Sequence, residues 1–338
     1  MKKLLTLAVA AAMTLSVAAA SATTLKLSEV HAEGYPTTLA DQEFARLIEE
    51  RTEGRIKVEV YSGGQLYGEE TGAIEALQLG DIAFARVSAS PVASYVPALN
   101  AIQMPYLYKN ADHMWAVLDG KIGQDMLAQI ESSGSGLVGL CWYDAGARSY
   151  YTTKQVSSVA DMKGLKIRMQ NNAMMVDMTN VLGGTGVTGI GPNEVYSAIK
   201  QGTIDGAENN WPTYQNMGDY EAATYYVLDE HTRVPEILLA SAEVLSGLDA
   251  ADVEIIKQCA IETEAYEKQK WAEKEESSEK IVREAGCTST ELTPEAYAEF
   301  QAAMTNPSDA LGGKSLYEKY GADYQDVIDA IAAVGEAY

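Results

Sequence analysis

The feature that most constrains the fold is a long stretch without glycine or proline, from Leu248 to Ala285. Asp249 can cap a helix at its start, and apolar residues recur through the stretch near helical spacing. A helix of about 36 residues would be about 54 Å long, which exceeds one lobe of ordinary size. A coiled coil is disfavoured because the heptad is not sustained and no ordered charges flank it. The sequence therefore predicts a helix that runs along two lobes.

The first part of the chain alternates between strand and helix patterns. Residues 25–30 and 55–61 have strand patterns, and residues 39–48 between them have helical spacing. This order predicts parallel sheets with helices on both faces. Segments 75–86 and 197–209 resemble each other, because each runs from a helix end through a glycine into a short apolar strand. We interpret them as matching parts of two similar lobes.

Residues 1–22 have the pattern of a secretory signal peptide. Lys2 and Lys3 precede an apolar run over residues 4–19, and Ala20-Ser21-Ala22 has the form of a cleavage site. The run is too short and too rich in alanine for a membrane anchor, and no cysteine near the cut would carry a lipid. We expect an exported, freely soluble periplasmic protein, cleaved after about Ala22.

The charge of the mature chain limits its partners. Removal of 22 residues from 338 leaves 316, which is enough for two lobes. Without Lys2 and Lys3, 23 basic residues stand against 48 acidic ones, a net charge of −25. Such a surface repels nucleic acid and anionic lipid, so an anion site must be local and built from arginine. Cys141, Cys259 and Cys287 form no metal pattern, and at most one pair of them could form a disulfide.

Catalytic and metal-binding motifs are absent from the sequence. It has no GxSxG, HExxH, P-loop or dinucleotide fingerprint. His31, His113 and His231 are not spaced as metal ligands, and the pair Glu69-Glu70 has no nucleophile or oxyanion device beside it. We therefore expect no enzyme, metal or cofactor. Carboxylate chemistry leaves faint motifs, so an exported carbohydrate-active enzyme stays open as the alternative of a different class.

Polar side chains lie where the predicted strands end, and in open α/β sheets ligands sit outside these carboxyl ends. Arg148 follows the strand at 136–143, and Arg168 lies on a short strand between Ile167 and Met169. The planar fork of arginine matches a carboxylate with two parallel hydrogen bonds, so two arginines near one pocket predict an organic anion. Glu208 either pairs with another residue or contacts the ligand. Further candidates at strand ends and in later loops are Arg86, Asn171, Asn209, Trp211 and His231.

Three runs carry a resemblance to a known family: GGQLYGEETGAIEALQLGDI at 63–82, MKGLKIRMQN at 162–171 and IGPNEVYSAIKQGTIDGAENN at 190–210. Together with Glu230-His231 they closely resemble the substrate-binding subunits of tripartite ATP-independent periplasmic (TRAP) transporters, the DctP family. The resemblance covers essentially the whole mature chain. It implies a type II periplasmic binding protein with two α/β lobes, a hinge and a long helix crossing both.

The resemblance also implies the domain limits and the partners. Residues 23–145 and 235–274 would form lobe I, and residues 146–234 and 275–338 would form lobe II. A small organic acid would bind between the lobes and pass to the membrane permease subunits of the transporter. We expect the binding protein to be a monomer.

Several site residues follow from the resemblance. Arg168 matches the arginine that clamps the ligand carboxylate, Arg148 matches a second arginine of some members, and Asn209 matches an asparagine that supports the carboxylate. Trp211 is expected to form a wall of the cleft. Positions that vary with the ligand are Glu70, Arg86, Asn171 and His231, and the first loop that borders the cleft contains His31, Glu33 and Tyr35.

The ligand we expect is a sugar acid such as glucuronate or galacturonate. The TRVPE segment after His231 is similar to that of sugar-acid-binding members, and Arg86 stands where sialic-acid binders carry an acid. A C4-dicarboxylate or a keto acid is the alternative, since Arg148 and Arg168 could hold two carboxylates. Glu70 favours the sugar acid, because a carboxylate accepts hydrogen bonds from hydroxyls and repels a ligand charged at both ends.

Overall fold

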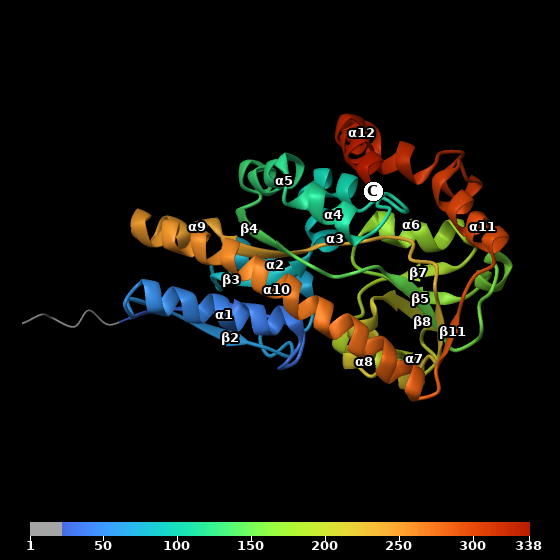
Figure 1. The fold of residues 1–338 in the computed structure, drawn as a ribbon, viewed down its shortest axis with the longest axis horizontal. Helices are drawn as coiled ribbons and strands as arrows, with labels where there is room; N and C mark the ends of the chain where they lie inside the picture. The colour runs from blue at the N-terminus through green and yellow to red at the C-terminus, as the bar shows by residue number, and fades with distance from the viewer. Residues whose placement is uncertain (1–21) are drawn as a thin grey trace, which may run out of the picture.

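The computed structural model describes residues 22–338, and the predicted signal peptide lies outside this range apart from Ala22. Two β-sheets, each with its own helices, form two lobes (Figure 1). No helix within residues 22–338 is both long and apolar enough to cross a membrane.

The first lobe contains a five-stranded sheet in the order β2-β1-β3-β10-β4. Its strands are β1 (Thr23–Ser28), β2 (Ile56–Tyr61), β3 (Phe84–Ser88), β4 (Leu137–Tyr143) and β10 (Glu236–Ser241). The first three are parallel, and β10 is antiparallel to both of its neighbours. Apolar side chains alternate between the two faces, so helices cover both. These helices are α1 (Pro36–Arg51), α2 (Glu70–Leu79), α3 (Ala89–Val92), α4 (Ala111–Leu118), α5 (Lys121–Ser132) and α9 (Ala242–Ser246).

The second lobe contains a six-stranded sheet in the order β11-β9-β5-β8-β6-β7. Its strands are β5 (Ser149–Thr152), β6 (Lys166–Arg168), β7 (Thr185–Val187), β8 (Gly206–Asn209), β9 (Tyr225–Val227) and β11 (Thr288–Thr290). Methionines of α6 (Ala173–Val181) pack with Ile167 and Met169 around β6. Apolar residues of α7 (Val195–Lys200) and α8 (Trp211–Asn216) form another cluster with side chains of β5, β8 and β9.

Both sheets are mixed rather than parallel, which corrects the prediction from the strand–helix–strand pattern. The antiparallel pairs involve β5 and β10, the first strands after the chain has crossed from one lobe to the other. The helical crossovers that enforce parallel pairing act only within a lobe. A strand that arrives from the other lobe is free to enter the sheet in the opposite direction.

The predicted long helix is confirmed as α10 (Ala250–Glu284), which crosses both lobes (Figure 1). It packs on α1 and β4 in the first lobe and on α8 in the second. Two extended segments, 144–148 and 228–235, also join the lobes. They touch where the backbone N–H of Arg148 donates to the carbonyl of Thr232 at 2.8 Å. This narrow crossing has the form of a hinge.

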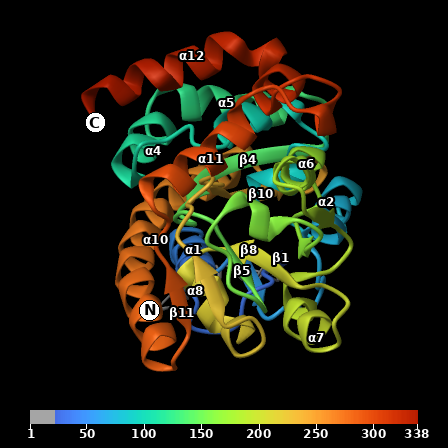
Figure 2. The same ribbon diagram turned by 90° about the vertical axis from the view of Figure 1, so that its right-hand side faces the viewer.

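The C-terminal part of the chain divides between the lobes. Helix α11 (Pro294–Thr305) packs on α6 in the second lobe. Helix α12 (Gln325–Val334) instead packs on α4 and α5 of the first lobe, and both views show it there (Figures 1 and 2). The prediction that all of residues 275–338 belong to lobe II is therefore wrong for α12. The predicted limits at 146 and 235 fall within or at the end of the two extended crossings.

Candidate ligand-binding site

The carboxyl ends of strands from both sheets meet around two small adjoining hollows. Ser88 at the end of β3 faces Arg168 at the end of β6 and Asn209 at the end of β8 across the larger one. The two hollows share Glu70, Arg168, Gln170 and Pro192, so we treat them as one cleft. Seven of the nine predicted site residues line it: Arg168, Arg148, Asn209, Glu70, Arg86, Asn171 and His31.

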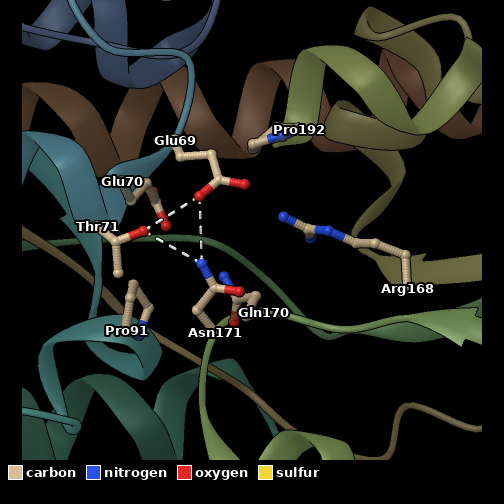
Figure 3. A pocket seen from close by; sticks show the side chains of 8 residues that line it. All are labelled: Glu69, Glu70, Thr71, Pro91, Arg168, Gln170, Asn171 and Pro192. Atoms are coloured by element: carbon tan, nitrogen blue, oxygen red, sulfur yellow. Dashed lines mark hydrogen bonds between the residues drawn. The ribbon is translucent and has the colours of Figure 1, made fainter. Parts of the chain in front are cut away.

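Arg168 presents an unpaired guanidinium to the cleft. Its Nε donates to the carbonyl of Ile190 at 2.9 Å, which fixes the side chain, and its terminal nitrogens have no protein partner within residues 22–338. Figure 3 shows the guanidinium pointing toward Glu69 and Glu70 on the opposite wall. The residue is buried, so it is not part of a solvated strand face. A buried guanidinium with free N–H donors is a strong binding site for a carboxylate, which accepts these hydrogen bonds.

Arg148 is already satisfied by the protein. Its Nε and Nη2 both donate to the carboxylate of Glu208, Nη2 at 2.8 Å, and its Nη1 donates to Oδ1 of Asn209 at 3.0 Å. Burial disfavours the charge on Glu208, but Arg148 and His231 outweigh it and hold the pKa of Glu208 at about 2. Glu208 therefore pairs structurally. Arg148 is a support for Asn209 rather than a second clamp of its own.

Asn209 keeps its donor group for the cleft. Its Oδ1 accepts from Arg148 and from the backbone N–H of Asn210, both at 3.0 Å. These two donors fix which end of the amide is oxygen. The Nδ2 hydrogens have no acceptor among residues 22–338, and Asn209 lines the cleft.

Arg86 is enclosed by carboxylates. It donates to Glu29, Glu70 and Glu236, and its Nη2 lies 2.7 Å from Nδ1 of His31. Its three nitrogens all have protein partners, so it has little left to offer a ligand anion. Burial, together with the neighbouring Arg86, lowers the pKa of His31. Arg86 thus holds two acids, Glu70 and Glu236, at the wall of the cleft.

Glu70 is the first residue of α2, and one of its carboxyl oxygens is hydrogen-bonded to the protein. Its Oε1 accepts from Nη1 of Arg86 at 2.7 Å and from the backbone N–H of Ser88 at 3.1 Å. Burial raises the pKa of Glu70 to about 7 although Arg86 opposes the rise. The carboxyl therefore titrates near neutral pH in the unliganded protein.

Asn171 of the second lobe forms a hydrogen bond to the first lobe. Its Nδ2 donates to Oγ1 of Thr71 at 3.1 Å, and its Oδ1 accepts from the backbone N–H of Gly189 at 3.0 Å. Figure 3 shows the side chain reaching toward Thr71 and Glu69. The amide is at the edge of the cleft, but both of its ends are occupied by protein groups.

Two predicted site residues lie elsewhere. Trp211 stacks on Tyr226 with ring centroids 3.7 Å apart and lines a separate hollow beside α10, so it is not a wall of the cleft. His231 is fully buried behind Glu208, with Nδ1 at 2.8 Å from Oδ2 of Asp229. Burial lowers the pKa of His231, but Asp229 and Glu208 outweigh it and raise the value to about 9. His231 supports the Glu208–Arg148 pair and does not reach the cleft.

The comparisons with known proteins agree with this geometry. A family model described as bacterial extracellular solute-binding protein, family 7 (DctP) matches residues 27–315. The chain belongs to this family. A solute-binding protein of Chromohalobacter salexigens is 32% identical over 91% of this chain and 88% of its own length.

Solved structures of other family proteins have the same fold. A TRAP periplasmic solute-binding protein of Pseudomonas putida F1 with bound D-glucuronate has a TM-score of 0.85 at 35% identity, over 92% of this chain and 97% of its own. One from Xanthobacter autotrophicus with bound β-D-galacturonate has a TM-score of 0.84 at 35% identity, over 91% and 99%. The predicted fold, two α/β lobes of a periplasmic binding protein, is thereby confirmed.

Sequence reasoning missed several residues that line the cleft of this DctP-family protein. Gln170 follows Arg168 by two positions and could have been found from that spacing, because side chains two apart share a strand face. Ser88 stands in the same relation to Arg86. Glu236 ends the TRVPE segment, but no local pattern shows that it lines the cleft, since it joins the site through the return crossing into β10. Other missed lining residues are Val30, Glu69, Thr71, Pro91, Pro192 and Thr213.

The described chain gives no indication of a metal centre. Within residues 22–338 no group of three or more histidine, cysteine, aspartate or glutamate side chains is placed to hold an ion. The cysteines are free, with Cys141 and Cys259 buried and Cys287 half-buried. The family is one of solute-binding transport proteins.

Proposed function

We propose that this protein captures a hexuronate in the periplasm and delivers it to the membrane permease of a TRAP transporter. The observation that carries the proposal is the unpaired guanidinium of Arg168, buried in a cleft lined by acids and amides. The family neighbours from Pseudomonas putida and Xanthobacter autotrophicus, which hold glucuronate and galacturonate, support the choice of ligand.

The charge pattern of the cleft favours one carboxylate over two. Of the three arginines that line it, Arg86 and Arg148 are neutralised by protein carboxylates, and Arg168 alone has free donors. A second ligand carboxylate would face Glu70 and Glu236 without an unpaired cation. Sugar hydroxyls instead donate to these acids. A hexuronate therefore fits better than a C4-dicarboxylate.

A thermal-shift screen tests the proposed function. D-glucuronate or D-galacturonate should raise the melting temperature of residues 23–338, whereas succinate and malate should have little effect. A ligand at 100 times its Kd stabilises the folded state by about 2.7 kcal/mol. Recovery of the ligand unchanged after long incubation separates a binding protein from a carbohydrate-active enzyme. A shift with succinate as large as with either hexuronate would contradict the ligand assignment.

Closure of the lobes around the hinge is the proposed mechanism. Two hydrogen bonds join the lobes: one lies between Tyr35 Oη and Thr213 Oγ1 at 2.9 Å, and in the other Gln170 Nε2 donates to Ser88 Oγ at 2.8 Å. Closure would exclude water and so strengthen the ion pair at Arg168. Small-angle scattering should give a smaller radius of gyration with D-glucuronate than without it. Superimposable curves at saturating ligand would argue against closure.

The carboxyl of Glu70 predicts a pH dependence of binding. Hydroxyl donors favour the ionised form, so a bound hexuronate lowers the pKa of Glu70 from about 7. Binding should therefore tighten as pH rises through 7, by up to about tenfold between pH 6 and 8. Glu70→Gln should reduce this pH dependence of affinity. It should also reduce the difference in affinity between glucuronate and succinate. If calorimetry gives the same pH dependence of affinity for Glu70→Gln as for the wild type, ionisation of Glu70 does not control binding.

A further inference from the structure

Gln170 lines the cleft, and its side-chain oxygen is buried without a hydrogen-bond partner within the described residues. It lies two residues after Arg168 and lines both hollows. The residue is 6% exposed, and its Oε1 has no hydrogen-bond donor among residues 22–338. A buried amide oxygen without a donor is costly, so such an atom calls for a partner.

A chain of hydrogen bonds sets the direction of this amide. The carboxylate of Glu236 can only accept, so the hydroxyl of Ser88 donates to its Oε1 at 2.9 Å. The Ser88 oxygen is then an acceptor for Nε2 of Gln170 at 2.8 Å. If the amide of Gln170 were turned over, two acceptors would face each other. Oε1 is therefore the end that is left free.

We propose that Gln170 selects the ligand by accepting a hydrogen bond from one of its hydroxyl groups. This inference rests on the proposed function, because it assumes that a sugar acid occupies the cleft. The ligand hydroxyl supplies the donor that Oε1 lacks. A carboxylate, a carbonyl or an ether oxygen at the same place would leave two acceptors in contact, and such a ligand is rejected.

Gln170 and Glu70 divide the selection between them. Glu70 is the stronger acceptor when it is ionised, and its pKa is about 7 in the unliganded protein. The amide of Gln170 carries no charge and does not titrate, so its preference for a hydroxyl holds at every pH. The two residues also lie on different lobes, Glu70 on α2 and Gln170 after β6. In a closed cleft they therefore contact the ligand from opposite sides.

Paired changes of protein and ligand test the proposal. In a set of D-glucuronates, each hydroxyl in turn is replaced by fluorine, which cannot donate, and binding to the wild type and to Gln170→Met is compared by calorimetry. One analogue should lose about 5- to 100-fold in affinity on the wild type, the effect of an unsatisfied buried acceptor. On Gln170→Met, the same analogue should bind as well as glucuronate.

Gln103→Met is the matched control. Gln103 is also buried, and its Oε1 also has no donor within residues 22–338, but the residue does not line the cleft. Gln103→Met should show the same loss of affinity for each fluorinated analogue as the wild type. Ser88→Ala covers the case in which Gln170→Met does not fold, because it releases the amide to rotate. The analogue that binds the wild type weakly should lose less affinity, relative to glucuronate, on Ser88→Ala.

The outcomes separate this inference from the proposed function. If the wild type binds glucuronate but every analogue shows the same loss on Gln170→Met as on the wild type, Gln170 does not select a hydroxyl, and the hexuronate function stands. If the wild type binds neither glucuronate nor galacturonate, the proposed function fails, and the role of Gln170 fails with it.

Discussion

Replacement of Arg168 by alanine is expected to weaken hexuronate binding by roughly 30-fold to several-thousand-fold. The substitution leaves the ligand carboxylate buried without its cationic partner, which costs about 2–5 kcal/mol. Among residues 22–338 the guanidinium has one hydrogen-bond partner, the carbonyl of Ile190, which accepts from Nε, so the fold should lose little. Calorimetry with D-glucuronate measures the affinity, and a thermal melt shows whether the protein remains folded.

Two further variants sharpen this result. Arg168→Lys keeps the charge but loses the planar fork, so its affinity should lie between those of the wild type and Arg168→Ala. Arg46→Ala is the control, because Arg46 is an exposed arginine on α1 that pairs with Glu43 and Glu50 far from the cleft. Wild-type affinity in Arg168→Ala would show that this arginine does not hold the carboxylate.

Glu208→Gln is expected to cost about 3–5 kcal/mol of folding free energy. Glu208 is fully buried between Arg148 and His231, and neutralising it leaves the charge of Arg148 without its ion-pair partner. Denaturant unfolding measures the loss. Asp125→Asn breaks the exposed pair of Asp125 with Lys121 on α5 and should have a far smaller effect. Equal effects of the two substitutions would show that the buried pair does not stabilise the fold.

Acid titration gives a second test of the same pair. The folded protein lowers the pKa of Glu208 from its usual 4.5 to about 2. Its contribution to stability is therefore complete above about pH 4.5 and is lost as pH falls toward 2. Wild-type stability should fall more steeply than that of Glu208→Gln across this range. Parallel curves for the two proteins would contradict the low pKa.

The elements with local signals could be predicted from the sequence. The stretch without glycine or proline became α10, and the strand ends at Arg168 and Asn209 did meet at one cleft. The assignment of residues 275–338 to lobe II came from the resemblance and not from a pattern in those residues. The placement of α12 depended on a tertiary contact with α4 and α5 that leaves no local pattern.

The roles of the arginines could not be predicted, because their partners come from distant parts of the chain. Arg86 is paired with Glu236, which is 150 positions away, and Arg148 with Glu208, which is 60 away. From the sequence, three arginines near strand ends all look available for an anion. Trp211 was misplaced for a related reason. It is the first residue of α8, and the turn into that helix directs its ring onto Tyr226 instead of into the cleft.

The most direct test of hexuronate binding is a calorimetric titration of residues 23–338 with D-glucuronate and D-galacturonate, alone and with succinate at comparable concentration. We expect at least one hexuronate to bind one site per chain, and we expect this succinate not to displace it. Displacement by succinate would contradict the sugar-acid assignment and leave carboxylate binding in place. Absence of binding by both hexuronates would contradict the proposed function itself.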